Sequence, residues 1–227
     1  MPNDRDIDAP VSLQGLWPDS DDEVIEGDES GFKQEYETQT IEVCSTPLQV
    51  RQFIFHSKNA NRVWPGTFNL AEYYLSSETS GDINDLKNKK VLELGSATGL
   101  LAIRLIQEGV TVITCDYKDE GEIKDNILHN FTLNNLPHVP HIEHTWGTGW
   151  VDGGFDVIVA SDILLYCGVY KELVFTLKEL IDKPEKKFVM SWNRRMEESK
   201  EFFELMEDGG FVCEHLGKCV YLFMLKT

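Results

Sequence analysis

The sequence predicts an α/β fold with a seven-stranded, mostly parallel sheet and helices on both faces. Apolar strands and amphipathic helices alternate from Val91 onward, and this order favours parallel strands joined by helical crossovers. Near the C-terminus, strands at 211–215 and 220–225 are separated by too few residues for a crossover, so we expect an antiparallel hairpin. A glycine turn, Gly95 to Gly99, joins the first strand of this series to its helix, as at a nucleotide site on a parallel sheet.

Residues 1–35 are predicted to form a flexible acidic tail. Residues 1–40 carry twelve acids and two bases, within a chain of 227 residues and formal charge −18. The tail has few apolar groups to bury. Two roles stay open for it: keeping the protein in solution, or attracting a basic partner.

Residues 36–60 are predicted to form a small N-terminal β-hairpin extension. Apolar and polar residues alternate from Tyr36 to His56, and Thr46-Pro47 is taken as the break between two short strands. The main domain is predicted to span 61–227. It opens with a loop at 61–66 and a helix that begins at Leu70, with Asn69 as its N-cap.

The remaining elements follow from apolar runs and their spacing. Arg194 and Arg195 are interpreted as the solvated start of the last helix, with contact to the substrate as the alternative. The predicted strands are 91–94, 110–115, 140–145, 155–161 and 187–192, and the predicted helices lie near 99–108, 119–135, 168–181 and 196–208.

The glycine turn indicates the kind of ligand. Ala97 and Leu100 stand where the second and third glycines of a dinucleotide-binding turn would be, which counts against a bound pyrophosphate. A nucleoside ligand without phosphates, such as S-adenosylmethionine, fits better. Asp116 ends the next apolar run and is predicted to accept hydrogen bonds from ribose hydroxyls, with capping of the following helix as the alternative.

The overall charge and the cysteines narrow the class of partner. An acidic chain is a poor ligand for nucleic acid, so a protein or peptide with a basic surface is the expected partner. No apolar run is long enough for a membrane span, and the N-terminus has no signal core. Five cysteines without a C-x-x-C pair indicate reduced thiols, and hence the cytoplasm, with or without the nucleus.

No metal site is expected. His138, His141 and His144 recur every third residue, but positions three apart on a strand point to opposite faces. These histidines therefore cannot converge on one ion.

Four segments together resemble methyltransferase family 16, the protein-methylating branch of the seven-strand class I methyltransferases, which have a Rossmann-like fold. The resemblance runs from about Gln39 to the C-terminus and leaves the tail outside. Its segments are Val63-Trp-Pro-Gly-Thr-Phe-Asn-Leu-Ala-Glu-Tyr-Tyr-Leu, Leu92-Glu-Leu-Gly-Ser-Ala-Thr-Gly-Leu-Leu-Ala-Ile, Thr145-Trp-Gly and Ala160-Ser-Asp-Ile-Leu-Leu-Tyr.

The resemblance implies a role for each matching position. Asp162 would face the methyl acceptor, and Tyr166 would offer it a ring face or hydroxyl. Two departures exist: Ala97 replaces the family's usual glycine, and three residues separate Asp162 from Tyr166 where the family usually has two. The implied cofactor-binding residues are Trp64, Glu93, Gly95, Ser96, Ala97, Gly99, Asp116, Trp146 and Ser161.

The implied activity is S-adenosylmethionine-dependent methylation of a side-chain nitrogen, lysine first, in a protein substrate, by an enzyme expected to be a monomer. Methylation of histidine, of an N-terminus or of a small amine is the alternative enzyme hypothesis. A methyltransferase fold that binds cofactor without activity and acts as a scaffold is the third hypothesis, and the two departures are the features that favour it.

Overall fold

The computed structural model describes residues 34–76, 81–118, 120–150, 154–193 and 196–226. Gln34–Thr227 form one compact unit. Almost all of the predicted tail and the arginines at 194 and 195 lie outside the described residues.

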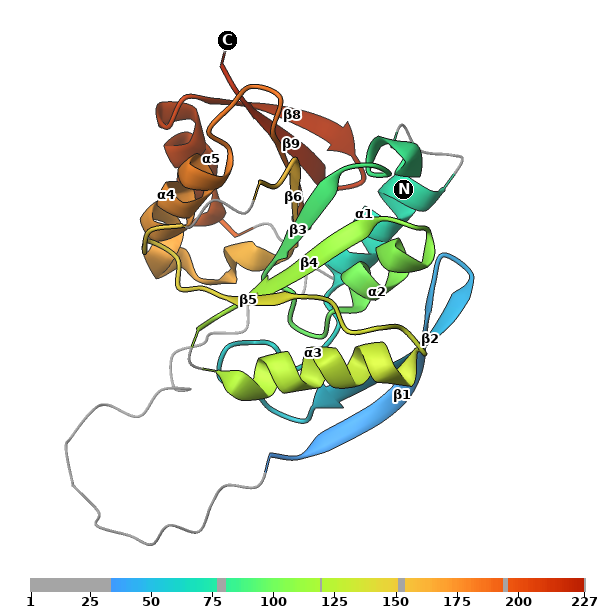
Figure 1. Ribbon diagram of the computed structural model, residues 1–227. Coiled ribbons are helices and arrows are strands. Elements are labelled where there is room, and N and C mark those ends of the chain that lie inside the picture. The colour runs from blue at the N-terminus through green and yellow to red at the C-terminus, as the bar shows by residue number, and fades with distance from the viewer. Residues whose placement is uncertain (1–33, 77–80, 119, 151–153, 194–195, 227) are drawn as a thin grey trace, which may run out of the picture. The chain divides into compact units, whose positions relative to one another are not determined.

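The predicted sheet is confirmed. Seven strands follow the order β5-β4-β3-β6-β7-β9-β8 (Figure 1). The pairs from β5 to β7 are parallel, whereas β9 pairs antiparallel with both β7 and β8. The strands are β3 (Lys90–Leu94), β4 (Thr111–Asp116), β5 (His141–Glu143), β6 (Val157–Ser161), β7 (Lys187–Ser191), β8 (Phe211–Gly217) and β9 (Val220–Leu225).

Helices cover both faces of the sheet, and each face has its own apolar core. On one face α1, α2 and α3 bury residues such as Leu70, Leu101 and Ile127, and on the other α4 and α5 bury residues such as Leu177 and Phe202 (Figure 1). None of the described helices is long and apolar enough to cross a membrane. The helices are α1 (Pro65–Leu75), α2 (Leu100–Gln107), α3 (Gly121–Leu133), α4 (Tyr170–Leu180) and α5 (Ser199–Asp208), with short 3-10 turns η1 (Ile83–Asp85), η2 (Ile163–Leu165) and η3 (Cys167–Val169).

The N-terminal hairpin pairs β1 (Tyr36–Val43) with β2 (Thr46–Phe53) in antiparallel register. The break predicted at Thr46-Pro47 is wrong. Pro47 lies inside β2 opposite Glu42, and the turn is Cys44–Ser45, where both residues have positive φ. A two-residue turn with this backbone suits the twist of a hairpin, although neither residue is one that usually signals it.

The start of α1 also differs from the prediction. The helix begins at Pro65, five residues before Leu70, so Asn69 is not its N-cap. Asn69 lies inside the helix, and its side chain donates to the Ser191 hydroxyl at 3.2 Å. Proline at the first helical position was the correct signal, because its fixed φ suits that position and it has no N–H to leave unpaired.

Three asparagines, two in α3 and one at its C-cap, bind the hairpin to this helix. Asn126, Asn130 and Asn134 are spaced four apart on one face of the helix. Their amides pair with the main chain of Arg51 and Gln49 at 2.7 to 3.1 Å. We call this set of contacts the asparagine ladder. On the edge of β2 that pairs with no strand, the ladder supplies hydrogen-bond partners for these main-chain groups.

Asn130 extends the ladder into the glycine turn, because its side-chain N–H₂ also donates to the carbonyl of Thr98 at 2.9 Å. Asn130→Ala should therefore lower the free energy of unfolding by about 1–3 kcal/mol, since it removes the hydrogen-bond partner of the Arg51 amide and of the buried Thr98 carbonyl. Urea unfolding measures this change. Asp125→Ala, at an exposed position of the same helix, is the control; an equal loss in both variants would contradict the ladder.

Candidate active site

A cavity of about 320 Å³ opens at the C-terminal ends of β3, β4 and β6. The chain order of the strands reverses between β3 and β6, which is where open α/β sheets bind ligands. The cavity is lined by Lys58, Asn59, Ala60, Trp64, Leu94, Gly95, Ala97, Cys115, Asp116, Tyr117, His144, Thr145, Trp146, Ser161, Asp162, Ile163, Leu165, Tyr166 and Val169.

The cavity brings together eight of the eleven predicted site residues. The exceptions are Glu93, Ser96 and Gly99, which do not line the cavity. The eight that line it are Trp64, Gly95, Ala97, Asp116, Trp146, Ser161, Asp162 and Tyr166.

The glycine turn has a left-handed backbone at three positions. Gly95, Ala97 and Gly99 have φ of 71°, 49° and 72°. A Cβ on Gly99 would come within 2.9 Å of Ile127, so that position requires glycine for space as well as conformation. The Ser96 hydroxyl fixes the turn from below: it donates to the carbonyl of Glu93 and accepts from the amide of Cys115.

Glu93 binds the start of α2. Its carboxylate accepts the amide N–H of Ala102, in the first turn of that helix, at 3.2 Å. The N-cap of α2 is Gly99, which has no side chain for this task. Burial raises the pKa of Glu93 to about 8, although the Ala102 amide opposes this shift. Glu93 is therefore a protonated, structural acid at neutral pH.

Asp116 binds the glycine turn with one oxygen and its own strand end with the other. Its carboxylate accepts the amide of Ala97 at 2.7 Å and that of Tyr117 at 2.8 Å. Burial raises the pKa of Asp116, and these two amides oppose the rise. A carboxylate has about four lone-pair positions, so two remain after these bonds. Asp116 can thus accept two hydroxyls from a ligand in the cavity.

Asp162 holds the start of α1. It has a left-handed backbone, with φ of 52°, and is 3% exposed. Its carboxylate accepts the amide of Gly66 at 2.6 Å. A Cβ on Gly66 would come within 2.8 Å of that carboxylate, so only glycine permits this approach. The bond supplies a cap that Trp64, the N-cap residue of α1, does not provide.

Tyr166 lines the cavity despite its changed spacing from Asp162. The intervening residues form η2, a single tight turn, and both side chains reach the same cavity. The ring of Trp146 packs edge-on against Tyr166, with centroids 6.5 Å apart. The three-residue separation is therefore compatible with a shared site.

The loop between β2 and α1 supplies lining residues that sequence reasoning missed. Lys58 lies over the ring of Tyr117 at 4.7 Å, and the carbonyl of Asn59 accepts the indole N–H of Trp64 at 2.8 Å. No periodicity or motif marks this loop. It follows the hairpin that the asparagine ladder binds to α3.

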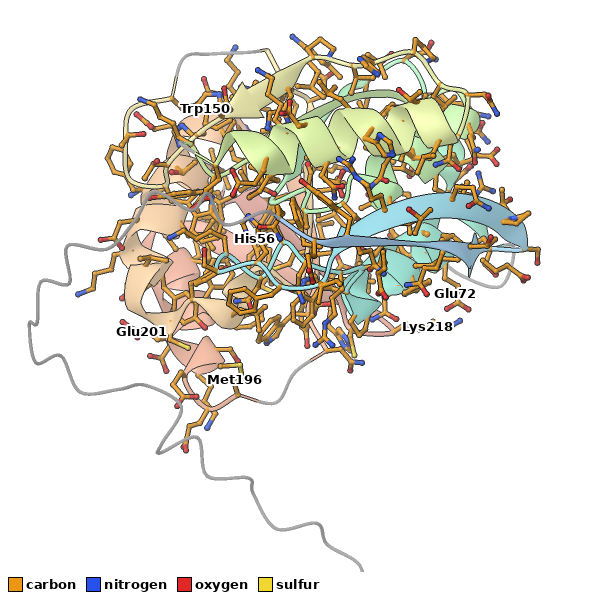
Figure 2. The ribbon with its side chains drawn as sticks, turned by 90° about the horizontal axis from the view of Figure 1, so that it is seen from below. His56, Glu72, Trp150, Met196, Glu201 and Lys218 are labelled. Carbon is orange, nitrogen blue, oxygen red and sulfur yellow. The ribbon has the colours of Figure 1, made fainter. Side chains whose placement is uncertain are left out.

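The histidines predicted not to converge have separate partners in the structure. His138, His141 and His144 face Thr132, Thr114 and Thr176 respectively. Among the described residues, His56, Glu120 and Glu122 do lie close together (Figure 2 labels His56). However, Nδ1 of His56 accepts the amide of Lys58, so in the neutral ring Nε2 carries the hydrogen and offers no lone pair to a metal.

The raised pKa of Glu93 predicts a pH-dependent stability. Between pH 4.5 and about 8 the folded chain keeps this proton and the unfolded chain loses it. The stability that this retained proton adds to the folded chain is therefore complete below pH 4.5. It is lost as pH rises to about 8, at up to ~1.4 kcal/mol per pH unit. Glu93→Gln should flatten this slope while keeping an acceptor for Ala102.

Urea unfolding at several pH values measures the slope. Glu37→Gln, at an exposed position of β1, is the control. Parallel curves for Glu93→Gln and the native chain would show that Glu93 does not titrate in this range.

Comparison with known proteins agrees with this geometry. The profile of a family described as lysine methyltransferase, methyltransferase family 16, matches residues 44–209. EEF1A lysine methyltransferase 3 of Xenopus tropicalis is 27% identical over 165 residues, which are 71% of this chain and 70% of that protein. Ribosomal protein L11 methyltransferase of Helicobacter pylori is 36% identical over 78 residues, which are 34% of this chain and 23% of that protein.

Among solved structures, the 16S rRNA N2 G1207 methyltransferase of T. Thermophilus is similar in fold, with a TM-score of 0.60 at 17% identity. That likeness covers 85% of this chain and 51% of the other. The chain thus spans less than two thirds of the length of the L11 and rRNA enzymes. Because the family profile matches more than half of its residues, the chain belongs to the lysine methyltransferase family.

Proposed function

We propose that this protein transfers a methyl group from S-adenosylmethionine to a side-chain nitrogen, lysine first, of another protein. The observation that carries the proposal is a single cavity that holds Asp116 together with Asp162 and Tyr166. The first residue is suited to a nucleoside, and the other two are suited to an amine. Family membership and the relative named for lysine methylation of EEF1A support this activity.

The residues present fit the cofactor. Asp116 has two lone pairs left for the ribose hydroxyls, and Trp64 and Trp146 give the cavity aromatic walls for a flat base. The glycine turn offers no pyrophosphate pattern. When bound, S-adenosylmethionine supplies an electrophilic methyl group on its sulfonium sulfur.

Asp162 and Tyr166 would place the acceptor, and the apolar lining of the cavity would favour loss of its proton. The Asp162 carboxylate and Tyr166 hydroxyl are hydrogen-bond acceptors for an amine entering the cavity. A free lysine has a pKa near 10.4, so the site must favour the deprotonated amine, which is the form that attacks the methyl group. Apolar walls such as Leu165 and Trp146 disfavour the charged ammonium by desolvation.

The alternative acceptors remain those weighed from the sequence: histidine, an N-terminus or a small amine. The scaffold hypothesis loses one of its two supports, because Ala97 adopts the left-handed backbone a glycine would take and its amide binds Asp116. A basic partner surface, a monomer without nucleic acid, and a cytoplasmic location, with or without the nucleus, stay as proposals.

Calorimetric titration with S-adenosylmethionine, S-adenosylhomocysteine and NAD tests the cofactor. We expect micromolar binding of the first two and none of NAD. Asp116→Asn should weaken binding about 10- to 150-fold, because an amide nitrogen cannot accept a hydroxyl and one charged hydrogen bond is lost. Asp125→Asn is the matched control. Binding unaffected by Asp116→Asn would remove the ribose role.

Tritium transfer from labelled S-adenosylmethionine into proteins of a cell extract tests the reaction. Asp162→Asn keeps an acceptor oxygen for Gly66 but loses the charge, so we expect cofactor affinity within a few-fold and a transfer rate lowered at least tenfold. Asp162→Ala would be a poorer variant, because it also frees the start of α1. Full transfer by Asp162→Asn would show that the charge does not serve the acceptor.

A further inference from the structure

Asn59 lies in the loop between β2 and α1 and lines the cavity. Its backbone is left-handed, with φ of 52°, a conformation that asparagine adopts more readily than most residues. Its amide donates to the carbonyl of His56 at 3.1 Å. The residue type therefore suits the turn, which places the side chain at the cavity.

Asn59 contacts two aromatic residues of the cavity: Trp64, five residues later in the chain, and Tyr166, 107 residues later. Its carbonyl accepts the indole N–H of Trp64 at 2.8 Å, and its side-chain Nδ2 donates to the Tyr166 hydroxyl at 3.2 Å. Trp146 packs against the Tyr166 ring from another element. Tyr166 is thus held at its ring by Trp146 and at its hydroxyl by Asn59.

The direction of the hydrogen bond from Asn59 decides which hydrogen-bonding positions of the Tyr166 hydroxyl remain for a ligand. A phenol oxygen has one hydrogen and two lone pairs. Asn59 occupies one lone pair, so the hydrogen and the other lone pair remain available in the cavity. Burial raises the pKa of Tyr166, so the group is a neutral phenol at neutral pH.

We propose that Asn59 is a positioning residue for methyl transfer: its hydrogen bond directs the free lone pair of Tyr166 to the N–H of the acceptor nitrogen. This inference rests on the proposed function and adds a residue that neither the motifs nor the spacing indicated. It requires that the Asn59 side chain act through Tyr166 and not through the cofactor. The bond from Asn59 to Trp64 comes from the main chain, so a change of the side chain leaves that bond in place.

Two variants remove the donor with little disturbance of the loop. Asn59→Asp keeps the size of the side chain and tolerates the left-handed backbone, and Asn59→Gly removes the side chain without backbone strain. Asn61→Asp and Asn61→Gly are matched controls, because Asn61 lies two residues along the same loop and does not line the cavity. Tyr166→Phe removes the acceptor of the bond.

Tritium transfer into extract proteins is then measured at saturating S-adenosylmethionine across a dilution series of the extract. Both Asn59 variants should lower the limiting rate about five- to tenfold, the size of one neutral hydrogen bond. The same changes in the Tyr166→Phe background should alter the rate less than twofold. Calorimetric cofactor affinity should stay within twofold throughout.

A measurement without substrate tests the contact itself. In urea unfolding of the four chains made by combining Asn59→Gly with Tyr166→Phe, the effects on the unfolding equilibrium constant should be non-additive by about fivefold. Additive effects, or an equal rate loss in both tyrosine backgrounds, would overturn the positioning role.

The native chain separates failure of this role from failure of the proposed function. If the native chain transfers no methyl group, the proposed function is overturned and this role with it. If the native chain transfers methyl groups but its rate does not change on substitution of Asn59, the positioning role alone is overturned.

Discussion

The hydrogen bond from the amide of Gly66 to the carboxylate of Asp162 is the contact on which the site depends. It joins the start of α1 to the end of β6, two segments 96 residues apart. The position of α1 sets Trp64 on one wall, and the end of β6 sets η2 and Tyr166 on another. A side chain larger than hydrogen at residue 66 would separate these segments, because its Cβ would overlap the carboxylate.

The same arrangement occurs on the neighbouring strand. Glu93 lies near the C-terminal end of β3 and binds the first turn of α2. In the same way, Asp162 directly follows β6 and binds the first turn of α1. In both cases the helix begins at a residue without a side-chain acceptor, and an oxygen of the acid takes the place of the missing cap. Asp116 differs, because it binds loop amides and keeps lone pairs for a ligand.

Much of this could be predicted from sequence. The alternation of elements gave the sheet correctly because hydrophobic periodicity is local, and the motif residues converge because parallel strands end at one edge. The second roles of Glu93 and Asp162 could not be predicted, since each depends on an amide supplied by another element. Lys58 and Asn59 were missed for a similar reason: their loop follows β2, which is bound by asparagines of α3 that lie 75 to 79 residues beyond Arg51.

The asparagine ladder has a consequence for the order in which the chain becomes functional during synthesis. The hairpin is made first, but its partners on α3 lie 75 to 85 residues downstream. At ordinary elongation rates the ribosome needs roughly 4 to 17 seconds to add them. An isolated two-stranded hairpin is marginal in water, so we expect this hairpin to become stable only once α3 has been made. The loop that carries Lys58 and Asn59 follows this hairpin, so the part of the cavity that it lines is expected to take its place no earlier than α3.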